Sequence, residues 1–337
     1  MHRILIPLEA TLATPAPGSE LLEIRGASMG TSWSAKILLP PALRQRWHQM
    51  HQCLQTRLDR IEQQMSHWRA DTDLSRFNRA PAGGWHTLPQ ELAQVVDYGL
   101  RLRQLSGAAF DPCAGALVRL WGFGATNRHD QMGFRVPDQA TIDALRLQLQ
   151  SLTPQWDAGQ RRLYQCGGIE LDLSAIAKGF AVDDLARWLH TQEIHHFLLE
   201  VGGELRGAGV KADGQPWWVQ LESVPGCAPV DHTLIALHGL AVATSGDYRQ
   251  HFRHQGRQLP HTLDPRHGKP LHNGLAAVTV VHAQCMVADA WSTALGVLGP
   301  QAGLELAAQQ QLAVRFLLRR GADLEAIHSP LWQAMLQ

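Results

Sequence analysis

Alternating apolar and polar positions mark the first folded segment of this 337-residue chain. The alternation covers residues 21–26 and 31–39, which flank a glycine-rich turn, and it predicts a β-hairpin. Apolar residues then recur at helical spacing over residues 43–65 and 89–106, and Gly107 ends the second of these helices. The first third of the chain is therefore predicted to be a hairpin followed by two helices.

The rest of the chain continues this mixture of elements. Asp138 is expected to cap a helix that runs to about Leu149. Residues 169–173 predict a buried strand, which leads into a helix that is capped by Ser174 and ends near residue 190. The remaining predicted elements are strands within 196–203, 217–223, 233–239, 240–246, 275–282 and 314–319, and helices over 285–298 and 302–309. Meandering strands with separated helices indicate an α+β protein rather than a strict alternation of strand and helix.

Composition narrows the class of protein. With 45% hydrophobic and 18% charged residues, the chain can bury a large core as one domain or as two intimate lobes. We expect a loose leader over residues 1–20, rich in Pro, Ala and Thr, and one domain over residues 21–337. The balance of 30 Lys and Arg against 30 Asp and Glu gives no reason to expect nucleic acid or an anionic membrane as a partner.

Two further classes are disfavoured. The five cysteines are scattered and form no CxxC pair, which argues against a disulfide framework or a thiolate zinc site. No apolar run is long enough to predict a transmembrane helix.

An oxygen-rich face is predicted on the helix over 285–298. Asp289, Ser292 and Thr293 are spaced at i, i+3 and i+4, so their side chains project from one side. Mg²⁺ prefers such hard ligands, and it commonly takes one or two protein carboxylates together with water and phosphate oxygens. An exposed polar face, or a hydroxyl that bonds back to its own helix, is the alternative that spacing leaves open.

A strand-to-helix joint at residues 171–184 is a second candidate. The predicted strand delivers Asp172 to a turn, and the N–H groups at the start of the following helix favour a phosphate. Lys178 lies one turn into that helix, within reach of the same anion. The joint carries neither the GxGxxG nor the Walker pattern, so a plain buried joint stays open.

Two loops offer further chemistry. Residues 106–112 present Phe110 and Asp111, an aromatic ring and a carboxylate suited to a heterocycle, although a helix end with a core Phe is the more common reason for such a segment. Residues 261–270 place His261 shortly before an Asp-Pro turn, and turn chemistry alone accounts for that Asp-Pro pair.

Taken in order along the chain, these segments resemble the ApbE family of FAD:protein FMN transferases. The matching stretches are MGTSWS at 29–34, MSHWRADTDLSRFN at 65–78, GAAFDPCAGALVRLWGFG at 107–124, LDLSAIAKGFAVD at 171–183, EVGGELRGAG at 200–209, AVATSGDYR at 241–249, HTLDPRHGKP at 261–270 and ADAWST at 288–293. The resemblance covers roughly Met29 to the C-terminus. Two positions depart from it, namely Thr72, where Ser is more usual, and Ala116, which replaces a Pro.

The resemblance implies a fold and a set of site residues. FAD is expected in a groove between two lobes of mixed or antiparallel sheet with flanking helices. The implied flavin contacts are Met29, Trp68, Ala109, Phe110, Asp111, Asp172, Lys178 and Leu263. The implied magnesium ligands are the side chains of Asp289, Ser292 and Thr293 and the main-chain carbonyl of Ala175. His261 matches the candidate general base.

The implied activity is Mg²⁺-dependent transfer of the FMN half of FAD to a Thr or Ser hydroxyl of an acceptor flavoprotein, such as a redox-complex subunit, with release of AMP. A Mg²⁺-dependent FAD pyrophosphatase would use the same residues with water as the nucleophile. A flavin-binding module without turnover is an alternative of another class, which the presence of His261, Asp289 and Lys178 disfavours. Family members are often exported and lipid-anchored, whereas residues 1–20 contain neither a signal nor a lipobox, so we expect a cytoplasmic protein.

Overall fold

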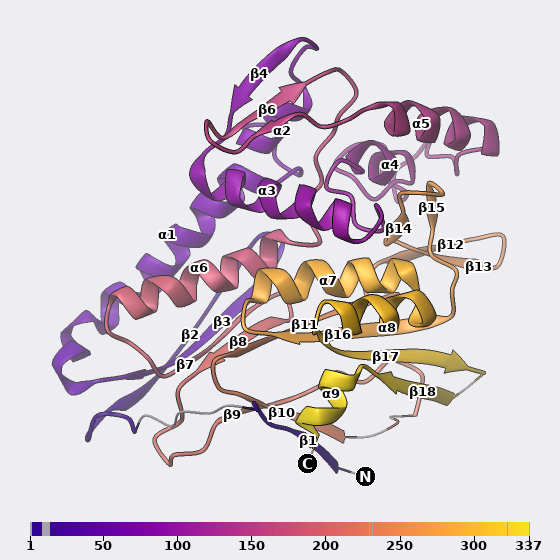
Figure 1. Cartoon of the computed structure of the whole chain (residues 1–337). Helices are drawn as coiled ribbons and strands as arrows, with labels where there is room; N and C mark the ends of the chain where they lie inside the picture. Colours follow the sequence, from indigo (N-terminus) through magenta and orange to yellow (C-terminus); the bar gives the residue numbers. More distant parts are fainter. Residues whose placement is uncertain (1, 9–13, 229, 231, 322, 337) are drawn as a thin grey trace. The chain divides into compact units, whose positions relative to one another are not determined.

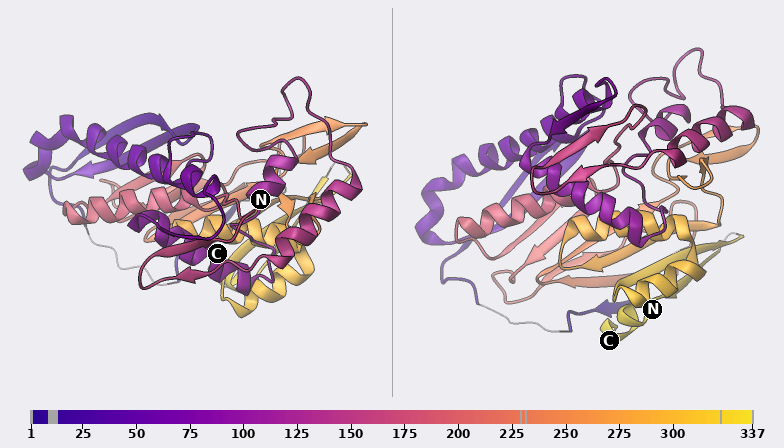
Figure 2. Two further views of the ribbon diagram at one scale, coloured as in Figure 1. Left: turned by 90° about the horizontal axis from the view of Figure 1, so that it is seen from above. Right: turned by 45° about the horizontal axis from the view of Figure 1, so that its top comes forward.

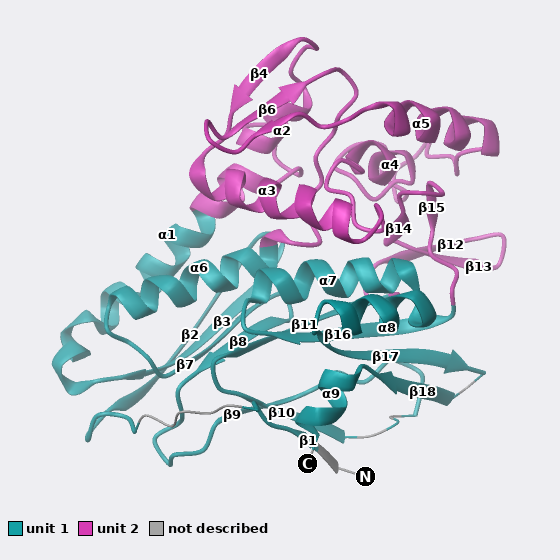
Figure 3. Cartoon of the chain, in the orientation of Figure 1, with its two compact units in different colours: residues 1–59, 178–246, 274–337 teal, residues 60–177, 247–273 magenta. Residues whose placement is uncertain are grey.

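The computed structural model describes residues 2–8, 14–228, 230, 232–321 and 323–336 (Figure 1). These residues form an α+β protein, as the sequence predicts. They divide into two compact units, each assembled from segments that are distant in sequence (Figure 3). Unit 1 comprises residues 1–59, 178–246 and 274–337, and unit 2 comprises residues 60–177 and 247–273.

Unit 1 is built on an eight-stranded sheet. Its strand order is β18 (Asp323–His328), β17 (Ala313–Arg320), β16 (Leu275–His282), β11 (Leu240–Gly246), β8 (Glu204–Ala208), β7 (Phe197–Val201), β3 (Thr31–Leu39) and β2 (Glu20–Ser28). Every neighbouring pair is antiparallel. The predicted hairpin is confirmed as β2 and β3, and its turn residues Met29 and Gly30 have φ values of 54° and 71°. Two successive positive φ angles match the right-handed twist of the strands that such a turn joins.

Helices α6 (Ala177–Thr191), α7 (Cys285–Leu298) and α8 (Pro300–Gln309) lie along one face of this sheet (Figures 1 and 2). α7 packs on β11 and β16, and it has the bounds that the sequence predicts. Most of its side chains are buried, polar Asp289 and Ser292 included. Burial of polar groups requires partners, and these define the site described below.

The opposite face of the sheet is covered by a second, smaller layer. This layer consists of the strands β1 (His2–Leu5), β10 (His232–Leu237) and β9 (Trp217–Gln220) and the helix α9 (Pro330–Met335). Trp332 and Leu5 are fully buried in its core. The composition of residues 1–20 predicts a loose leader, but residues 2–5 pair in parallel with β10, because burial of Leu5 anchors them.

Unit 2 is mainly helical, with small sheets. Its helices are α2 (Asp73–Asn78), α3 (Gln90–Leu105), α4 (Gly115–Leu120) and α5 (Gln139–Ser151). Its strands form the sheet β4 (Gly84–Thr87), β6 (Arg162–Gln165) and β5 (Trp156–Asp157) and the pairs β12 (His251–His254) with β13 (Arg257–Pro260) and β14 (Leu263–Asp264) with β15 (Lys269–Pro270). The helix α1 (Trp47–Met65) follows the 3₁₀ helix η1 (Pro41–Arg46) and runs from residues of unit 1 into residues of unit 2. Asp138 caps α5 as predicted, since its carboxylate accepts a 2.8 Å hydrogen bond from the N–H of Thr141.

The strand predicted over 169–173 is wrong. Within this segment only Glu170 pairs, in a single bridge to Ala114. The side-chain amide of Asn78 donates a 2.9 Å hydrogen bond to the carbonyl of Leu171 and accepts a 2.7 Å hydrogen bond from its N–H. This side chain therefore takes the place of a neighbouring strand. An apolar run alone does not reveal such a side-chain partner.

The helix cap predicted at Ser174 is also wrong. α6 begins at Ala177, after a turn in which the N–H of Ser174 donates to the carboxylate of Asp172 at 2.8 Å. Asp172, rather than the serine hydroxyl, therefore organises this turn. Among the described helices, none has the length and apolar character needed to cross a membrane.

Candidate functional site

Two helices of unit 1 meet at the buried carboxylate of Asp289. The N–H of Gly179, in the first turn of α6, donates a 2.9 Å hydrogen bond to Oδ2 of Asp289, which is 3% exposed. A Cβ added at Gly179 would lie 2.5 Å from the carbonyl oxygen of Cys285 and 2.8 Å from Cβ of Asp289. Since the N–H groups of a first helical turn lack partners within the helix and favour negative charge, the glycine lets α6 bind this carboxylate.

Three hydroxyl groups lie together where α7 meets β11, two of them within one helical turn of Asp289. Oγ of Ser245, near the end of β11, lies 2.7 Å from Oγ of Ser292 and 2.9 Å from Oγ1 of Thr293. The hydroxyl of Ser292 also donates a 2.8 Å hydrogen bond to the main-chain carbonyl of Asp289, one turn earlier in α7. α7 and β11 thus present a set of hard oxygen donors, of a kind that suits Mg²⁺.

Lys178 supplies positive charge to the same region. Its Nζ donates a 3.1 Å hydrogen bond to Oε1 of the buried Glu204 and lies 3.9 Å from Oδ1 of Asp289. The lysine stem passes Gly202, where an added Cβ would lie 3.1 Å from Cδ of Lys178 and 2.9 Å from Cγ2 of Thr31. Unit 1 therefore brings the turn between β2 and β3, the start of α6 and the oxygen-rich face of α7 together.

Asp183 fixes the position of α7 on α6. Its buried carboxylate accepts hydrogen bonds from the N–H groups of Cys285 at 3.0 Å and Met286 at 2.9 Å, and it pairs with the guanidinium of Arg206. The residue that precedes α7, Gln284, makes no side-chain cap of its own. A carboxylate from the neighbouring helix thus caps α7 and helps to hold Asp289 in place.

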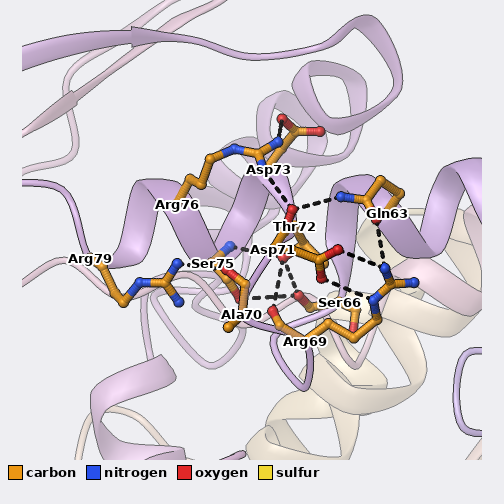
Figure 4. Close-up of polar contacts among 10 residues, drawn as sticks. All are labelled: Gln63, Ser66, Arg69, Ala70, Asp71, Thr72, Asp73, Ser75, Arg76 and Arg79. Atoms are coloured by element: carbon orange, nitrogen blue, oxygen red, sulfur yellow. Dashed lines mark hydrogen bonds and ion pairs between the residues drawn. The ribbon is translucent and has the colours of Figure 1, made fainter.

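In unit 2, a loop with many internal hydrogen bonds joins α1 to α2 (Figure 4). The hydroxyl of Thr72 donates a 2.6 Å hydrogen bond to the carbonyl of Ser66 and accepts a 3.1 Å hydrogen bond from the N–H of Ser75. The second bond caps α2. Arg69 binds the carboxylate of Asp71 through two nitrogens, at 3.1 and 2.8 Å. These bonds give the loop a defined conformation.

Trp68 lies in this loop with half of its surface exposed. The ring of His67 packs at 4.9 Å from the indole ring, and the guanidinium carbon of Arg128 lies 5.6 Å from its centroid. Nδ1 of His67 is 3.9 Å from Oδ1 of Asp172. His67 therefore links two of the implied flavin contacts, Trp68 and Asp172.

The implied contacts at 109–111 lie in a tight turn after α3. Phe110 is 4% exposed and packs against α3, where an added Cβ at Gly99 would lie 3.6 Å from its ring. The carboxylate of Asp111 accepts 2.9 Å hydrogen bonds from Nε of Arg103 and from the N–H of Cys113. Ala109 is buried as well. In the protein alone, both side chains of the Phe-Asp pair have partners within unit 2.

His261 has a defined orientation. Its Nδ1 lies 3.0 Å from the carbonyl oxygen of Gln250, which also accepts the backbone N–H of His261 at 3.0 Å. Because a carbonyl only accepts, Nδ1 carries the proton, and the lone pair of the neutral imidazole is on Nε2. That is the tautomer a general base needs.

The residues after His261 are held firmly. Leu263 is buried in a cluster with Leu117 and Trp121. Burial raises the pKa of Asp264, but hydrogen bonds from Arg266 and His267 outweigh it and lower that pKa below its ordinary value. The ionised carboxylate therefore closes the turn that follows the histidine.

The chain is similar to known proteins over most of its length. The sequence profile of the ApbE family matches residues 29–317. The chain belongs to the ApbE family. Proteins named FAD:protein FMN transferase from Escherichia coli K12 and Vibrio cholerae are 32% and 33% identical to it, and the alignments cover 94% and 89% of this chain and 90% and 88% of the relatives.

Solved structures of the ApbE family have the same fold. The flavinyl transferase ApbE of Pseudomonas stutzeri superposes with a TM-score of 0.82 at 34% identity, over 94% of this chain and 97% of that one. The flavin transferase ApbE of Vibrio cholerae gives a TM-score of 0.83 at 31% identity, over 94% and 99%. The expectation of an ApbE fold is confirmed.

Both departures from the ApbE pattern are conservative in structural terms. Thr72 caps α2 through its hydroxyl, as a serine would. Ala116 lies in the first turn of α4. Because a backbone N–H in the first turn has no partner within the helix, either Pro or Ala fits at this position.

The implied site residues fall into two groups. Met29, Lys178, Asp289, Ser292 and Thr293 belong to unit 1, and Trp68, Ala109, Phe110, Asp111, Asp172, Ala175, His261 and Leu263 belong to unit 2. Ser245, Glu204 and Gly179 also belong to the unit 1 group, although the sequence pattern does not single them out. Each lies within a quoted motif, but only the packing of α6, β8 and β11 brings Gly179 to Asp289, Glu204 to Lys178 and Ser245 to Ser292.

Proposed function

We propose that this ApbE-family protein transfers the FMN half of FAD to a Thr or Ser hydroxyl of an acceptor flavoprotein, with Mg²⁺ as cofactor and AMP as the leaving group. The observation that carries the proposal is the oxygen-rich cluster of unit 1, in which a buried carboxylate, three hydroxyls and a lysine lie together. The names of the relatives support flavin transfer as the reaction class.

The donor set fits a magnesium ion bound together with a diphosphate. Asp289, Ser292 and Thr293 would hold the metal, and the carbonyl of Ala175, two residues before α6, is the fourth proposed ligand. The described residues contain no group of three or more His, Cys, Asp and Glu side chains able to hold a metal. A site with one carboxylate is typical of Mg²⁺, which takes its remaining ligands from water and substrate phosphates. When bound, Mg²⁺ would compensate the charge of the diphosphate.

The protein's own residues supply the remaining functions. Lys178 would pair with a phosphate oxygen, as the start of α6 would through its N–H groups. Nε2 of His261 would accept the proton of the acceptor hydroxyl. That oxygen forms a bond to the FMN-side phosphorus, while the bond from this phosphorus to the bridging oxygen breaks, and AMP leaves with the bridging oxygen.

A magnesium-dependent FAD pyrophosphatase is the second candidate function. It would use the same residues with water in place of the acceptor hydroxyl, so the geometry of each unit is compatible with both. A binding module without turnover fits less well, because the oriented tautomer of His261 has no use in binding alone.

The proposal is tested with an acceptor flavoprotein that carries one flavinylation hydroxyl. With FAD and Mg²⁺, the acceptor should become covalently fluorescent on a denaturing gel, and EDTA or a Thr→Val change at the acceptor site should prevent this. Equal labelling with and without Mg²⁺ would contradict the metal assignment, and labelling of the Thr→Val acceptor would contradict hydroxyl transfer.

A further inference from the structure

A basic pocket in unit 2 adjoins His261. It has a volume of about 350 Å³, and the lining residues that matter here are Trp68, Phe123, Arg128, Arg249, Gln250 and His251. All of them belong to unit 2. Trp68 and Phe123 contribute aromatic surface. The lining also holds Asp130, which pairs with Arg128, so two arginines against one Asp leave the wall a formal net charge of +1.

The pocket and the proposed base share a residue, Gln250. Gln250 lines the pocket, and the carbonyl of the same residue fixes the tautomer of His261 at 3.0 Å. The ring of Phe123 lies 6.3 Å from the imidazole of His261. A molecule bound in the pocket therefore contacts residues that hold or neighbour the imidazole of His261.

The charge of this region differs from that of the whole chain. Residues 247–273 contain five Lys and Arg against two Asp, a formal net charge of +3, whereas the chain as a whole is neutral. Much of the excess lies on the hairpin β12–β13 and the residues before it, where Arg249, Arg253 and Arg257 are exposed. The hairpin pairs with no other strand among the described residues.

We propose that this pocket and hairpin, named here the acceptor patch, bind an acidic segment of the acceptor polypeptide next to its Thr or Ser. The inference rests on the proposed function, because only a transferase needs a second, polypeptide substrate beside the base. Charge complementarity identifies the partner as acidic. A Trp and a Phe beside two arginines form the kind of surface that anchors a peptide.

The test is a displayed peptide library with one fixed Thr, incubated with the full-length protein, FAD and Mg²⁺ and sorted for covalent flavin fluorescence. Labelled peptides should be enriched in Asp and Glu around the Thr. Labelling without acidic enrichment would overturn the acceptor patch and leave the transferase proposal intact. Absence of any labelled peptide, together with release of free FMN and AMP, would count against the transferase and the patch together.

A charge reversal sharpens the test. Arg249→Glu should lower kcat/KM for the best acidic peptide about tenfold and leave FAD affinity unchanged. Arg101→Glu, an equal change of charge at an exposed position of α3 in unit 2 but outside the acceptor patch, is the matched control and should have a much smaller effect. A fall in FAD affinity with Arg249→Glu would assign the pocket to the flavin, and equal effects of the two variants would show a nonspecific charge effect; either result would overturn the patch.

Discussion

Replacement of Gly179 by alanine tests the junction on which the candidate magnesium site depends. The added Cβ would lie 2.5 Å from the carbonyl oxygen of Cys285 and 2.8 Å from Cβ of Asp289, and both are parts of a packed helix rather than flexible side-chain ends. α6 and α7 must therefore move apart. The movement also lengthens the 2.9 Å hydrogen bond from residue 179 to Asp289.

The expected magnitude follows from three contributions. Overpacking costs about 1–3 kcal/mol, and weakening of a hydrogen bond to a charged group costs up to about 1.5–3 kcal/mol. Alanine in a helix gains about 1 kcal/mol over glycine. The net effect of Gly179→Ala should be a loss of about 2 kcal/mol in the free energy of unfolding, which lowers Tm by about 3 °C for a chain of this length.

Gly296→Ala in α7 is the matched control. Its added Cβ would meet only Cγ2 of Val278, at 3.8 Å, which is an ordinary contact. This variant should be as stable as the wild type or gain up to about 1 kcal/mol from helix propensity. Both variants are measured by thermal and urea unfolding, and by FAD titration with Mg²⁺. If Gly179→Ala matched Gly296→Ala in stability and retained full Mg²⁺-dependent FAD affinity, the proposed role of the junction would be refuted.

Three further changes test individual residues. Asp289→Ala should abolish transfer and weaken Mg²⁺-dependent FAD binding in a titration, whereas Ser292→Ala should be milder because water replaces a neutral ligand; full activity of Asp289→Ala would remove the metal assignment. His261→Ala should bind FAD normally but lose about two to four orders of magnitude in single-turnover transfer, and a near-normal rate would exclude it as the base. Since the pKa of Asp264 is lowered in the folded state, its ionised form stabilises the fold above about pH 4, and this stability is lost as the pH falls through the folded pKa. Asp264→Asn should therefore lower the free energy of unfolding at pH 7 by about 2 kcal/mol and make urea unfolding depend less on pH in the acid range. An unchanged pH dependence of urea unfolding below about pH 4 would contradict this.

The elements of unit 1 were largely predictable from the sequence because their signals are local. The alternation in β2 and β3 and the apolar character of α7 predict the correct elements, and the predicted bounds of α7 agree with the structure. Failures occurred where a long-range partner replaces a local one. Asn78 satisfies Leu171 and prevents a strand, and burial of Leu5 orders the first residues.

The candidate site was predictable only in part, for a similar reason. Helical spacing identified Asp289, Ser292 and Thr293 as one face, since three positions on one helix need no tertiary information. Ser245 and Gly179 come from other elements, and their contacts with that face depend on how β11 and α6 pack against α7. A glycine's role in close approach is visible only when the neighbouring helix is known.

The most direct measurement is the fate of both halves of FAD in one reaction. The protein is incubated with FAD, Mg²⁺ and a purified acceptor flavoprotein, then the acceptor is analysed by intact mass spectrometry while AMP and free FMN are quantified. The account predicts that the acceptor gains the mass of one FMN less one water, with one AMP released per acceptor modified and little free FMN. Equal amounts of free FMN and AMP with an unmodified acceptor would identify a pyrophosphatase and contradict the transferase.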